Sequence, residues 1–247
     1  MQTNQPPART TPSPKYIVSD EHHFVYFVLQ KVACSSVKTA LLSLFDLETA
    51  PYEEALEDGG KILKVHKLFD KSRHQVDKKR FVNGLKNGRY RDHFKFAFVR
   101  NPWDRLVSCY SQKLVGEGRR PDTAPDLNPP GVERRFYLHM PFAEFVEAVH
   151  RTPDEEANPH FRSQHLVVCR QGPKKRIMAD FVGRFERLNE DFAIVVERIG
   201  APHLELPHRL RSPNRESRAY ADFYDDRLRR LVHERFRDDI EIFGYSF

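Results

Sequence analysis

The 247-residue sequence lacks any long run of apolar residues, and its first stretch, MQTNQPPARTTPSPKY, is polar and rich in proline. A signal peptide needs an apolar core, and a membrane-spanning helix needs about 20 mostly apolar residues. We therefore expect a soluble, cytoplasmic protein without a membrane span. Residues 1–14 are predicted to form a disordered polar tail, and residues 15–247 are predicted to form one domain.

Cysteine is also scarce. The three cysteines, Cys34, Cys109 and Cys169, are scattered, and no two of them form a C-x-x-C pair. This excludes a disulfide framework and the usual zinc and thiol-redox motifs. The sequence offers no convincing cluster of metal ligands, so we expect no metal and a reducing compartment.

An excess of acidic residues is absent as well. The chain has 41 Lys and Arg against 35 Asp and Glu, a formal net charge of +6 and a pI near 9.2. This balance favours anionic partners such as nucleotides, acidic polysaccharides or nucleic acids, but it does not choose among them. No long polybasic tail is present, so most charges are expected on an ordinary solvated surface.

The apolar residues that are present alternate between two patterns. Short apolar runs predict strands at residues 23–30, 61–66, 94–99 and 179–185. Helices are predicted after most of these strands. One opens near Ser35 or Ser36, and the other segments with helical spacing or helical potential are residues 75–88, 141–150, 189–200 and 217–237. Residues 116–133, rich in proline and glycine, predict a surface loop or lid. Strands alternating with helices predict an α/β fold, a single domain with a central parallel sheet flanked by helices.

The segment FVRNPWDRLVSCY, residues 98–110, passes from a predicted strand into a predicted helix. Asn101 suits the N-cap and Pro102 the first helical position. Ser108 falls off the apolar stripe of this helix, so Arg100 and Ser108 could share one anion. The alternative, that Arg100 pairs with a nearby carboxylate such as Asp104, stays open on spacing alone.

A second segment, QKVACSSVK at residues 30–38, also joins a predicted strand to a helix. Its backbone N–H groups could point at a phosphate, with Lys31 supplying charge and Ser35 or Ser36 a hydroxyl. It is not a Walker A loop, because that loop needs glycines and a lysine at its end. A plain strand–helix connection with Lys31 in solvent is the alternative.

Together the two segments resemble the binding motifs of sulfotransferases that use 3′-phosphoadenosine 5′-phosphosulfate (PAPS), QKVACSSVK the 5′-phosphosulfate loop and FVRNPWDRLVSCY the 3′-phosphate motif. The resemblance is closest to carbohydrate sulfotransferases of the chondroitin and dermatan 4-O type, where a K-V-[AG]-C-[ST] loop is familiar. NPHFRSQ at 158–164, DFVGRFERLNEDF and the ending RDDIEIFGYSF continue it, so it spans roughly residues 23–247. It implies a P-loop-like sulfotransferase fold and a soluble bacterial-type member.

The sequence departs from the family pattern at three loop positions. Ala33 and Cys34 stand where cytosolic sulfotransferases tend to carry glycine and threonine, so backbone amides must supply more of the contact. Gln30 stands in place of the usual proline. The membrane anchor of Golgi relatives is not found in this sequence.

The resemblance implies a sulfuryl transfer from PAPS, a co-substrate, to a hydroxyl of a carbohydrate acceptor, without a metal. For catalysis it implies His66 as the base, in a K-x-H segment like that of sulfotransferases, with Lys31 at the leaving group and Lys64 assisting on the same strand face. Donor-binding residues would be Lys31, Ala33, Cys34, Ser35, Ser36, Val37, Arg100 and Ser108. Acceptor-binding residues would be His160, Arg162 and Gln164.

Several alternatives remain open from the sequence. His160 competes with His66 for the role of base, although it could equally bind the acceptor. Without the resemblance, His66 would read as a strand-end histidine that caps a carbonyl. A P-loop-like kinase or nucleotide hydrolase and a non-catalytic binder of polyanions, nucleic acid or acidic glycan, are the competing functions. The sugar, the hydroxyl sulfated and the oligomeric state are not encoded in a recognisable pattern.

Overall fold

The computed structural model describes residues 12–55, 60–115, 127–128, 135–207 and 219–247. They group into two compact units. The unit that we call the sheet unit comprises Ser13–Arg100 and Gln164–Arg211, and the helical unit comprises Met1–Pro12, Asn101–Ser163 and Ser212–Phe247. The loop predicted at 116–133 and the tail predicted at 1–14 fall largely outside the described residues. The prediction of one domain over 15–247 stays a prediction.

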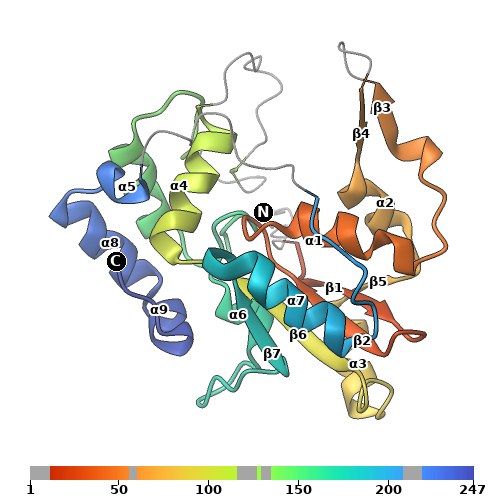
Figure 1. Ribbon diagram of the computed structural model, residues 1–247. Helices are drawn as coiled ribbons and strands as arrows, with labels where there is room; N and C mark the ends of the chain where they lie inside the picture. Colours follow the sequence, from red (N-terminus) through yellow and green to blue (C-terminus); the bar gives the residue numbers. More distant parts are fainter. Residues whose placement is uncertain (1–11, 56–59, 116–126, 129–134, 208–218) are drawn as a thin grey trace, which may run out of the picture. The chain divides into compact units, whose positions relative to one another are not determined.

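The sheet unit holds a five-stranded sheet in the order β5-β1-β2-β6-β7 (Figure 1). The strands are β1 Lys15–Ser19, β2 Phe24–Val28, β5 Gln75–Asp77, β6 Phe94–Val99 and β7 Phe181–Arg184. Strand β6 runs parallel to both β2 and β7, whereas β1 is antiparallel to β2 and β5. The predicted α/β fold with a parallel core is therefore confirmed, but the sheet as a whole is mixed, because the unpredicted strand β1 joins it in the opposite direction.

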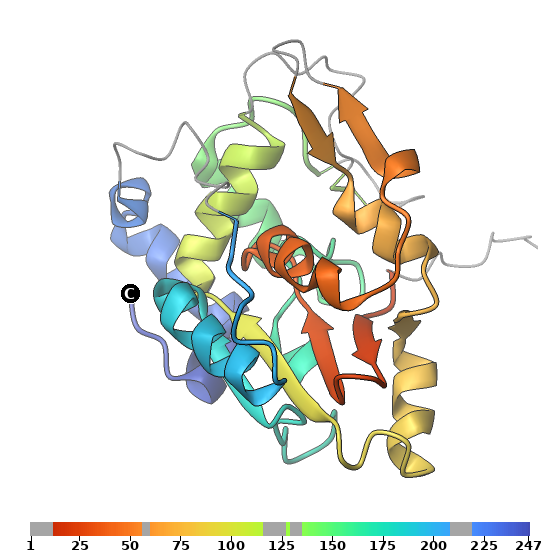
Figure 2. The same cartoon turned by 45° about the vertical axis from the view of Figure 1, so that its right-hand side comes forward.

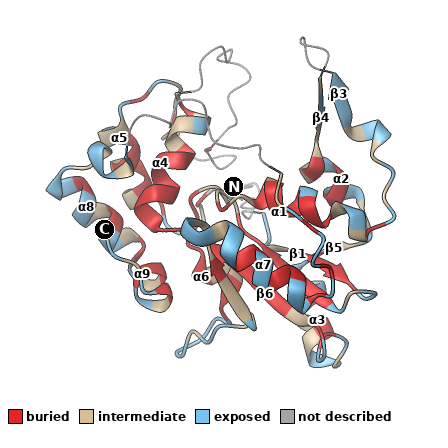
Figure 3. Cartoon of the chain, in the orientation of Figure 1, coloured by how far each residue is buried: buried red, intermediate tan, exposed pale blue. Residues whose placement is uncertain are grey.

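Helices α1 Cys34–Leu41 and α7 Leu188–Arg198 cover one face of this sheet, as both ribbon views show (Figures 1 and 2). The ring of Phe192 in α7 lies 6.4 Å from that of Phe98 in β6. Helix α3, Lys78–Lys86, packs Phe81 against Tyr16 with a centroid distance of 4.1 Å. Strands buried on both faces read as continuous apolar runs, which is why β2 and β6 were predictable. Figure 3 shows β2 and most of β6 in the colour of buried residues.

Gly183 in β7 is required by a close approach. A Cβ atom built there would lie 2.5 Å from the Phe98 ring and 3.2 Å from Cβ of Asp191. A distance of 2.5 Å does not occur between non-bonded carbon atoms and 3.2 Å is an unusually tight contact, so a side chain at this position would require the Phe98 ring to shift and helix α7 to yield slightly. Glycine thus lets β7 pair closely with β6.

The remaining elements of the sheet unit are short. Strands β3 Glu53–Ala55 and β4 Lys61–Leu63 form a separate antiparallel pair, followed by α2 Val65–Lys71. The strand predicted at 61–66 is therefore wrong in two respects. It ends at Leu63, since residues 65 and 66 are helical, and it lies in the separate β3–β4 pair and not in the central sheet. The helix predicted at 75–88 begins three residues late, after β5. The other elements are α6 His165–Val168 and the 3₁₀ turns η1 Leu42–Leu44, η2 Ala50–Tyr52 and η4 Phe185–Arg187.

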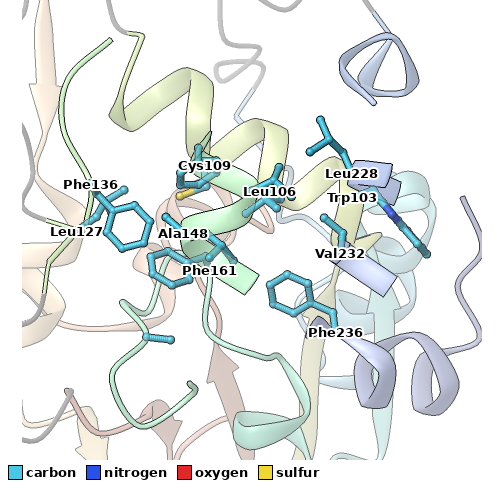
Figure 4. Close-up of a cluster of buried hydrophobic side chains, with 14 of the residues drawn as sticks. Trp103, Leu106, Cys109, Leu127, Phe136, Ala148, Phe161, Leu228, Val232 and Phe236 are labelled. Carbon is cyan, nitrogen blue, oxygen red and sulfur yellow. The ribbon is translucent and has the colours of Figure 1, made fainter. Parts of the chain in front are cut away.

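The helical unit packs around a core of aromatic and aliphatic side chains (Figure 4). Its elements are α4 Pro102–Lys113, α5 Phe142–Arg151, η6 Tyr220–Phe223, α8 Asp226–Arg235 and α9 Arg237–Phe243. Asn101 caps α4 as predicted, because its Oδ1 accepts a hydrogen bond from the Trp103 N–H at 3.0 Å. The described part of the helix predicted at 217–237 is instead divided among η6, α8 and the start of α9, because the backbone is extended at Tyr224 and Asp225 and leaves the helical range at Phe236.

Candidate active site

The loop between β2 and α1 has an unusual backbone. Lys31 has a φ of 68° and Ala33 a φ of 61°, both in the left-handed region that residues with a side chain rarely adopt. Left-handed residues within a turn orient successive N–H groups into an anion-binding concavity, and the start of α1 adds the positive end of its dipole. The loop therefore has the backbone form that phosphate-binding loops use, without their glycines.

Arg100 braces this loop from the end of the neighbouring strand. Its Nη1 donates a hydrogen bond to the carbonyl oxygen of Lys31 at 3.0 Å, and its guanidinium carbon lies 3.9 Å from the centre of the Phe185 ring. Because β2 and β6 are adjacent and parallel, the segments that follow them meet at the same edge of the sheet. The structure thus brings together Lys31 and Arg100, the basic residues that the two sequence motifs assign to anion binding. Phe185 was missed, since nothing in its spacing marks it.

Gln164, predicted to bind the acceptor, holds the backbone of Arg100. Its Oε1 accepts from the Arg100 N–H and its Nε2 donates to the Arg100 carbonyl oxygen, each at 2.9 Å. The side chain is 1% exposed. Such a reciprocal pair fixes the backbone from which the Arg100 side chain leaves the sheet. Any contact of Gln164 with an acceptor stays a prediction.

His66 lies in the first turn of α2, not at the end of a sheet strand as its sequence context predicted. Val65, Leu68 and Phe69 are buried at i, i+3 and i+4, and this helical signal was present in the sequence. Nε2 of His66 lies 2.7 Å from Oγ of Ser35 and 4.0 Å from Sγ of Cys34. The structure therefore brings His66 to the first turn of α1, next to two predicted donor-binding residues.

Lys64 does not share a strand face with His66. It precedes α2 with a φ of −77° and a ψ of 62°, which is not extended backbone. Its Nζ forms a salt bridge with Glu54 at 2.8 Å, and 39% of its side chain is exposed. The predicted placement is wrong because the strand ends at Leu63, and a catalytic role for Lys64 stays a prediction.

The first helix also carries Cys34, Ser36, Val37 and Lys38, all buried. The Cys34 thiol donates to Oε1 of Gln30 at 3.4 Å, and burial raises the pKa of the thiol although Lys38 and Lys31 lower it. Cys34 is thus a protonated thiol at neutral pH, consistent with a contribution through its backbone.

Lys38 is a buried lysine that the sequence did not single out. It is 1% exposed, its Nζ donates to Oε1 of Gln75 at 3.2 Å, and the Phe69 ring centre lies 5.5 Å away. Burial lowers the pKa of Lys38 to about 8, against the attraction of the Asp70 carboxylate. No apolar periodicity reveals such a lysine, since it occupies a position where solvent exposure would be expected.

The remaining predicted residues lie in the helical unit. Ser108 on α4 is 8% exposed, and Asp104 and Arg105 are buried too, so the first turns of this helix are buried on more sides than the predicted stripe. Arg105 donates to the carbonyl oxygens of Arg162 at 2.8 Å and Pro159 at 3.2 Å. Arg105 thereby holds the segment that contains His160.

His160 and Arg162 have different surroundings within that segment. His160 places Nδ1 at 2.6 Å from Oδ1 of Asn158, which also accepts from the His160 N–H. Nδ1 therefore carries a proton, so a neutral ring has its lone pair on Nε2. Arg162 is 9% exposed and donates to the carbonyl oxygens of Ala157 and Pro12. The contacts of Arg162 are structural, and its role toward an acceptor stays a prediction.

The described ranges bear on two further expectations, a metal site and a membrane span. There, no group of three or more His, Cys, Asp and Glu side chains has a metal-binding arrangement. In the same ranges, no helix has the length and apolar character needed to cross a membrane.

Residues 14–246 match the sulfotransferase family, so the chain belongs to this family of enzymes. The family assigned from the two motifs is confirmed. Carbohydrate sulfotransferase 12 of Xenopus laevis is 26% identical over 93% of this chain and 59% of its own length. Carbohydrate sulfotransferase 14 of Danio rerio is 29% identical over 78% of this chain and 50% of its own. Carbohydrate sulfotransferase 9 of Homo sapiens is 25% identical over 93% and 52%.

The chain therefore spans between half and three fifths of the length of these curated relatives. No solved structure shows significant similarity to it. The chain is a sulfotransferase-family enzyme with carbohydrate sulfotransferases among its relatives.

Proposed function

We propose that this protein transfers a sulfuryl group from PAPS to a hydroxyl of a carbohydrate acceptor. The observation that carries the proposal is the hydrogen bond of 3.0 Å from Arg100 to the Lys31 carbonyl. It joins the loop that resembles a 5′-phosphosulfate site to the residue that resembles the start of a 3′-phosphate site. A nucleotide with phosphates at both positions needs two anion sites a short distance apart, and this hydrogen bond supports such a pair at this edge of the sheet.

The loop would hold the 5′ end of the donor. The N–H groups of residues 33–36 and the Lys31 charge would stabilise a leaving phosphate, whose negative charge grows as the sulfur–oxygen bond breaks. The Val37 N–H, which was predicted to join them, donates instead to the carbonyl oxygen of Ala33 at 3.1 Å. Ser35 and Ser36 add hydroxyl groups at the start of α1. Arg100 is assigned to the 3′-phosphate, which distinguishes this donor from AMP and ATP, and the donor-binding role of Ser108 stays a prediction.

The acceptor hydroxyl must lose a proton as its oxygen bonds to sulfur. An imidazole is suited to accept that proton, because its ordinary pKa of about 6.5 is close to neutral pH. His66 is our first choice, since its Nε2 lies beside the first turn of α1. His160 is assigned to acceptor binding, and its Nε2 lone pair keeps it the competing base.

Nucleotide binding tests the donor. Calorimetry without magnesium should show adenosine 3′,5′-bisphosphate binding more tightly than AMP or ATP, and raising the melting temperature accordingly. Equal affinity for AMP would contradict the 3′-phosphate assignment. Magnesium-dependent ATP turnover would favour a kinase or hydrolase, and salt-sensitive binding of polyanions without nucleotide preference would favour a non-catalytic binder.

Sulfate transfer tests the acceptor. Radiolabelled donor is incubated with a panel of glycans. Desulfated chondroitin and dermatan are its first members, because QKVACSSVK resembles the loop of chondroitin and dermatan 4-O sulfotransferases, and other glycans follow because the curated relatives are carbohydrate sulfotransferases. Transfer to at least one glycan is expected. Bisphosphate binding without transfer to any glycan, but with transfer to another hydroxyl compound, would retain the donor and correct the acceptor.

A further inference from the structure

The imidazole of His66 contacts two side chains of the first turn of α1 in unequal ways. The distance of 2.7 Å between Nε2 and Oγ of Ser35 is that of a full hydrogen bond. The distance of 4.0 Å between Nε2 and Sγ of Cys34 is at the limit of a sulfur contact, and that thiol donates to Gln30 instead. Ser35 therefore makes the stronger of these two contacts at Nε2.

The Ser35 hydroxyl has a single hydrogen to donate. A base needs a lone pair on Nε2, and in that tautomer the Ser35 O–H must be the donor of the 2.7 Å bond. Ser35 is also the second residue of α1, at the helix end where the proposed donor places its 5′-phosphate. One hydroxyl hydrogen thus has two possible acceptors, a ring nitrogen and an anion oxygen.

We propose that Ser35 is a positioning residue that makes His66 available as a base only when the donor is bound. Its hydroxyl donates either to Nε2 of His66, occupying the lone pair, or to an oxygen of the anion at the start of α1, releasing that lone pair. An anionic oxygen is the stronger acceptor, so binding of the donor shifts the hydroxyl away from the ring. This inference rests on the proposed function.

The coupling gives the reaction an order. Proton removal from the acceptor follows donor binding, because the imidazole lone pair is engaged until the anion takes the hydroxyl. Ser35 itself neither attacks sulfur nor carries the proton of the acceptor. It acts through His66, and it is distinct from Ser36, which is buried in the same turn.

The test measures how fast the lone pair of His66 reacts. Diethyl pyrocarbonate at pH 8, where an ordinary imidazole is neutral, is followed by peptide mass spectrometry, with exposed His23 as the internal control. Adenosine 3′,5′-bisphosphate should accelerate modification of His66 about three- to tenfold, the value of one hydrogen bond. Ser35→Ala should react at the faster rate without nucleotide, and Ser35→Thr, which keeps a hydroxyl, should restore the slow rate and the acceleration.

The direction of the effect separates coupling from simple shielding, because a nucleotide that merely covers His66 slows its modification. Bisphosphate binding by calorimetry with unchanged or slower modification in the wild type overturns the coupling and leaves the proposed function intact. No bisphosphate binding overturns the proposed function and the coupling together. Ser35→Ala that reacts at the wild-type rate, or Ser35→Thr that fails to restore it, overturns the role of the hydroxyl.

Discussion

His66 in the sheet unit and His160 in the helical unit are held by different kinds of contact. His66 bonds to Ser35, which lies 31 positions away in the chain and on another helix. His160 bonds to Asn158, two positions away in the same turn. A contact within one turn fixes a tautomer locally, whereas a contact between helices can be exchanged when a ligand competes for it. The difference favours His66 as the regulated base and His160 as a fixed binding group.

The largest effect is expected for His66→Ala. A general base contributes about 10²–10⁴-fold to the rate, so turnover should fall by that factor while adenosine bisphosphate still binds. Turnover at saturating acceptor and bisphosphate affinity by calorimetry are the measurements. His160→Ala is the matched control, which should mainly raise the KM for the acceptor. The comparison is reversed if His160→Ala alone abolishes turnover.

The next largest effect is on stability, in the segment that carries His160. Asp154 accepts from Nη2 of Arg235 at 2.7 Å and from the Ser163 N–H at 3.0 Å. Asp154→Ala leaves the arginine, whose side chain is 9% exposed, without its counter-charge, and should lower the free energy of unfolding by about 3 kcal/mol. Urea unfolding measures it, with the exposed Glu155→Gln as control. A change in the free energy of unfolding equal to that of the control would show that Asp154 does not stabilise this segment.

The same carboxylate should make this stability depend on acid. Burial raises the pKa of Asp154, but the hydrogen bond and the charge of Arg235 lower it by more than burial raises it. The pKa of Asp154 therefore lies below its ordinary value. A lowered pKa contributes stability above pH about 4, and this contribution is lost as the pH falls toward the pKa of the folded state. The difference between wild type and Asp154→Ala should therefore shrink between pH 4 and more acidic buffers.

Arg100→Ala tests the donor side of the comparison. The preference for adenosine 3′,5′-bisphosphate over AMP should disappear, a loss of about 1.5–3 kcal/mol for hydrogen bonds to a charged group. Arg100→Lys keeps the charge but not the two-pronged geometry, and should recover only part of the preference. Competition calorimetry with both nucleotides gives the ratio of affinities. An intact preference in Arg100→Ala would restrict this residue to bracing the Lys31 carbonyl.

Lys38→Met tests whether the helix that carries Ser35 contains a buried charge. The pKa of Lys38 is lowered by burial to about 8, so between pH 8 and about 10.4 the unfolded chain binds more protons than the folded one. Relative to Lys38→Met, the wild type should gain stability across this range, at most about 1.4 kcal/mol per pH unit. Chemical denaturation at several pH values measures it, and the exposed Lys79→Met should follow the wild type.

The smallest effect is expected for Cys34→Ser. A serine hydroxyl can make the same bond to Gln30 and leaves the backbone N–H unchanged, so activity should be retained and stability should change by less than about 1.5 kcal/mol. Turnover and thermal unfolding are the measurements. A large loss of activity would show that the sulfur is needed for packing against the loop.

Part of the fold followed from the sequence because local and tertiary preferences agree. Strands β2, β6 and β7 lie in predicted runs, and α5 and α7 were also predicted, since their apolar periodicity matches the faces they bury. The N-cap Asn101 was predictable because its bond to the Trp103 N–H spans two residues. Strand β1 was missed, because its pairing with β2 and β5 depends on tertiary contacts and not on local sequence preference.

The candidate site was predicted less completely. The motifs predicted Lys31, Ser35, Arg100 and His66 as site residues. The structure joins them in two pairs, since Arg100 bonds to the Lys31 carbonyl oxygen and Ser35 bonds to His66. The structure corrected the element that carries His66. It also revealed the stacking of Arg100 on Phe185 and the hydrogen bonds of Gln164 to the Arg100 backbone. Both contacts join segments that are far apart in the chain.

The sequence by itself determined the family, the two strand–loop–helix motifs and the types of residue at their turns, because motifs and caps depend on neighbours within a few positions. Tertiary structure decided the mixed sheet, the left-handed backbone of Lys31 and Ala33, and the helical setting of His66. The physical reason is that each feature depends on contacts between distant segments. The mixed sheet depends on strand pairing, the loop contacts the Arg100 side chain through the Lys31 carbonyl, and the helix of His66 buries Val65, Leu68 and Phe69. Contacts between distant segments stabilise conformations that local preference alone does not select.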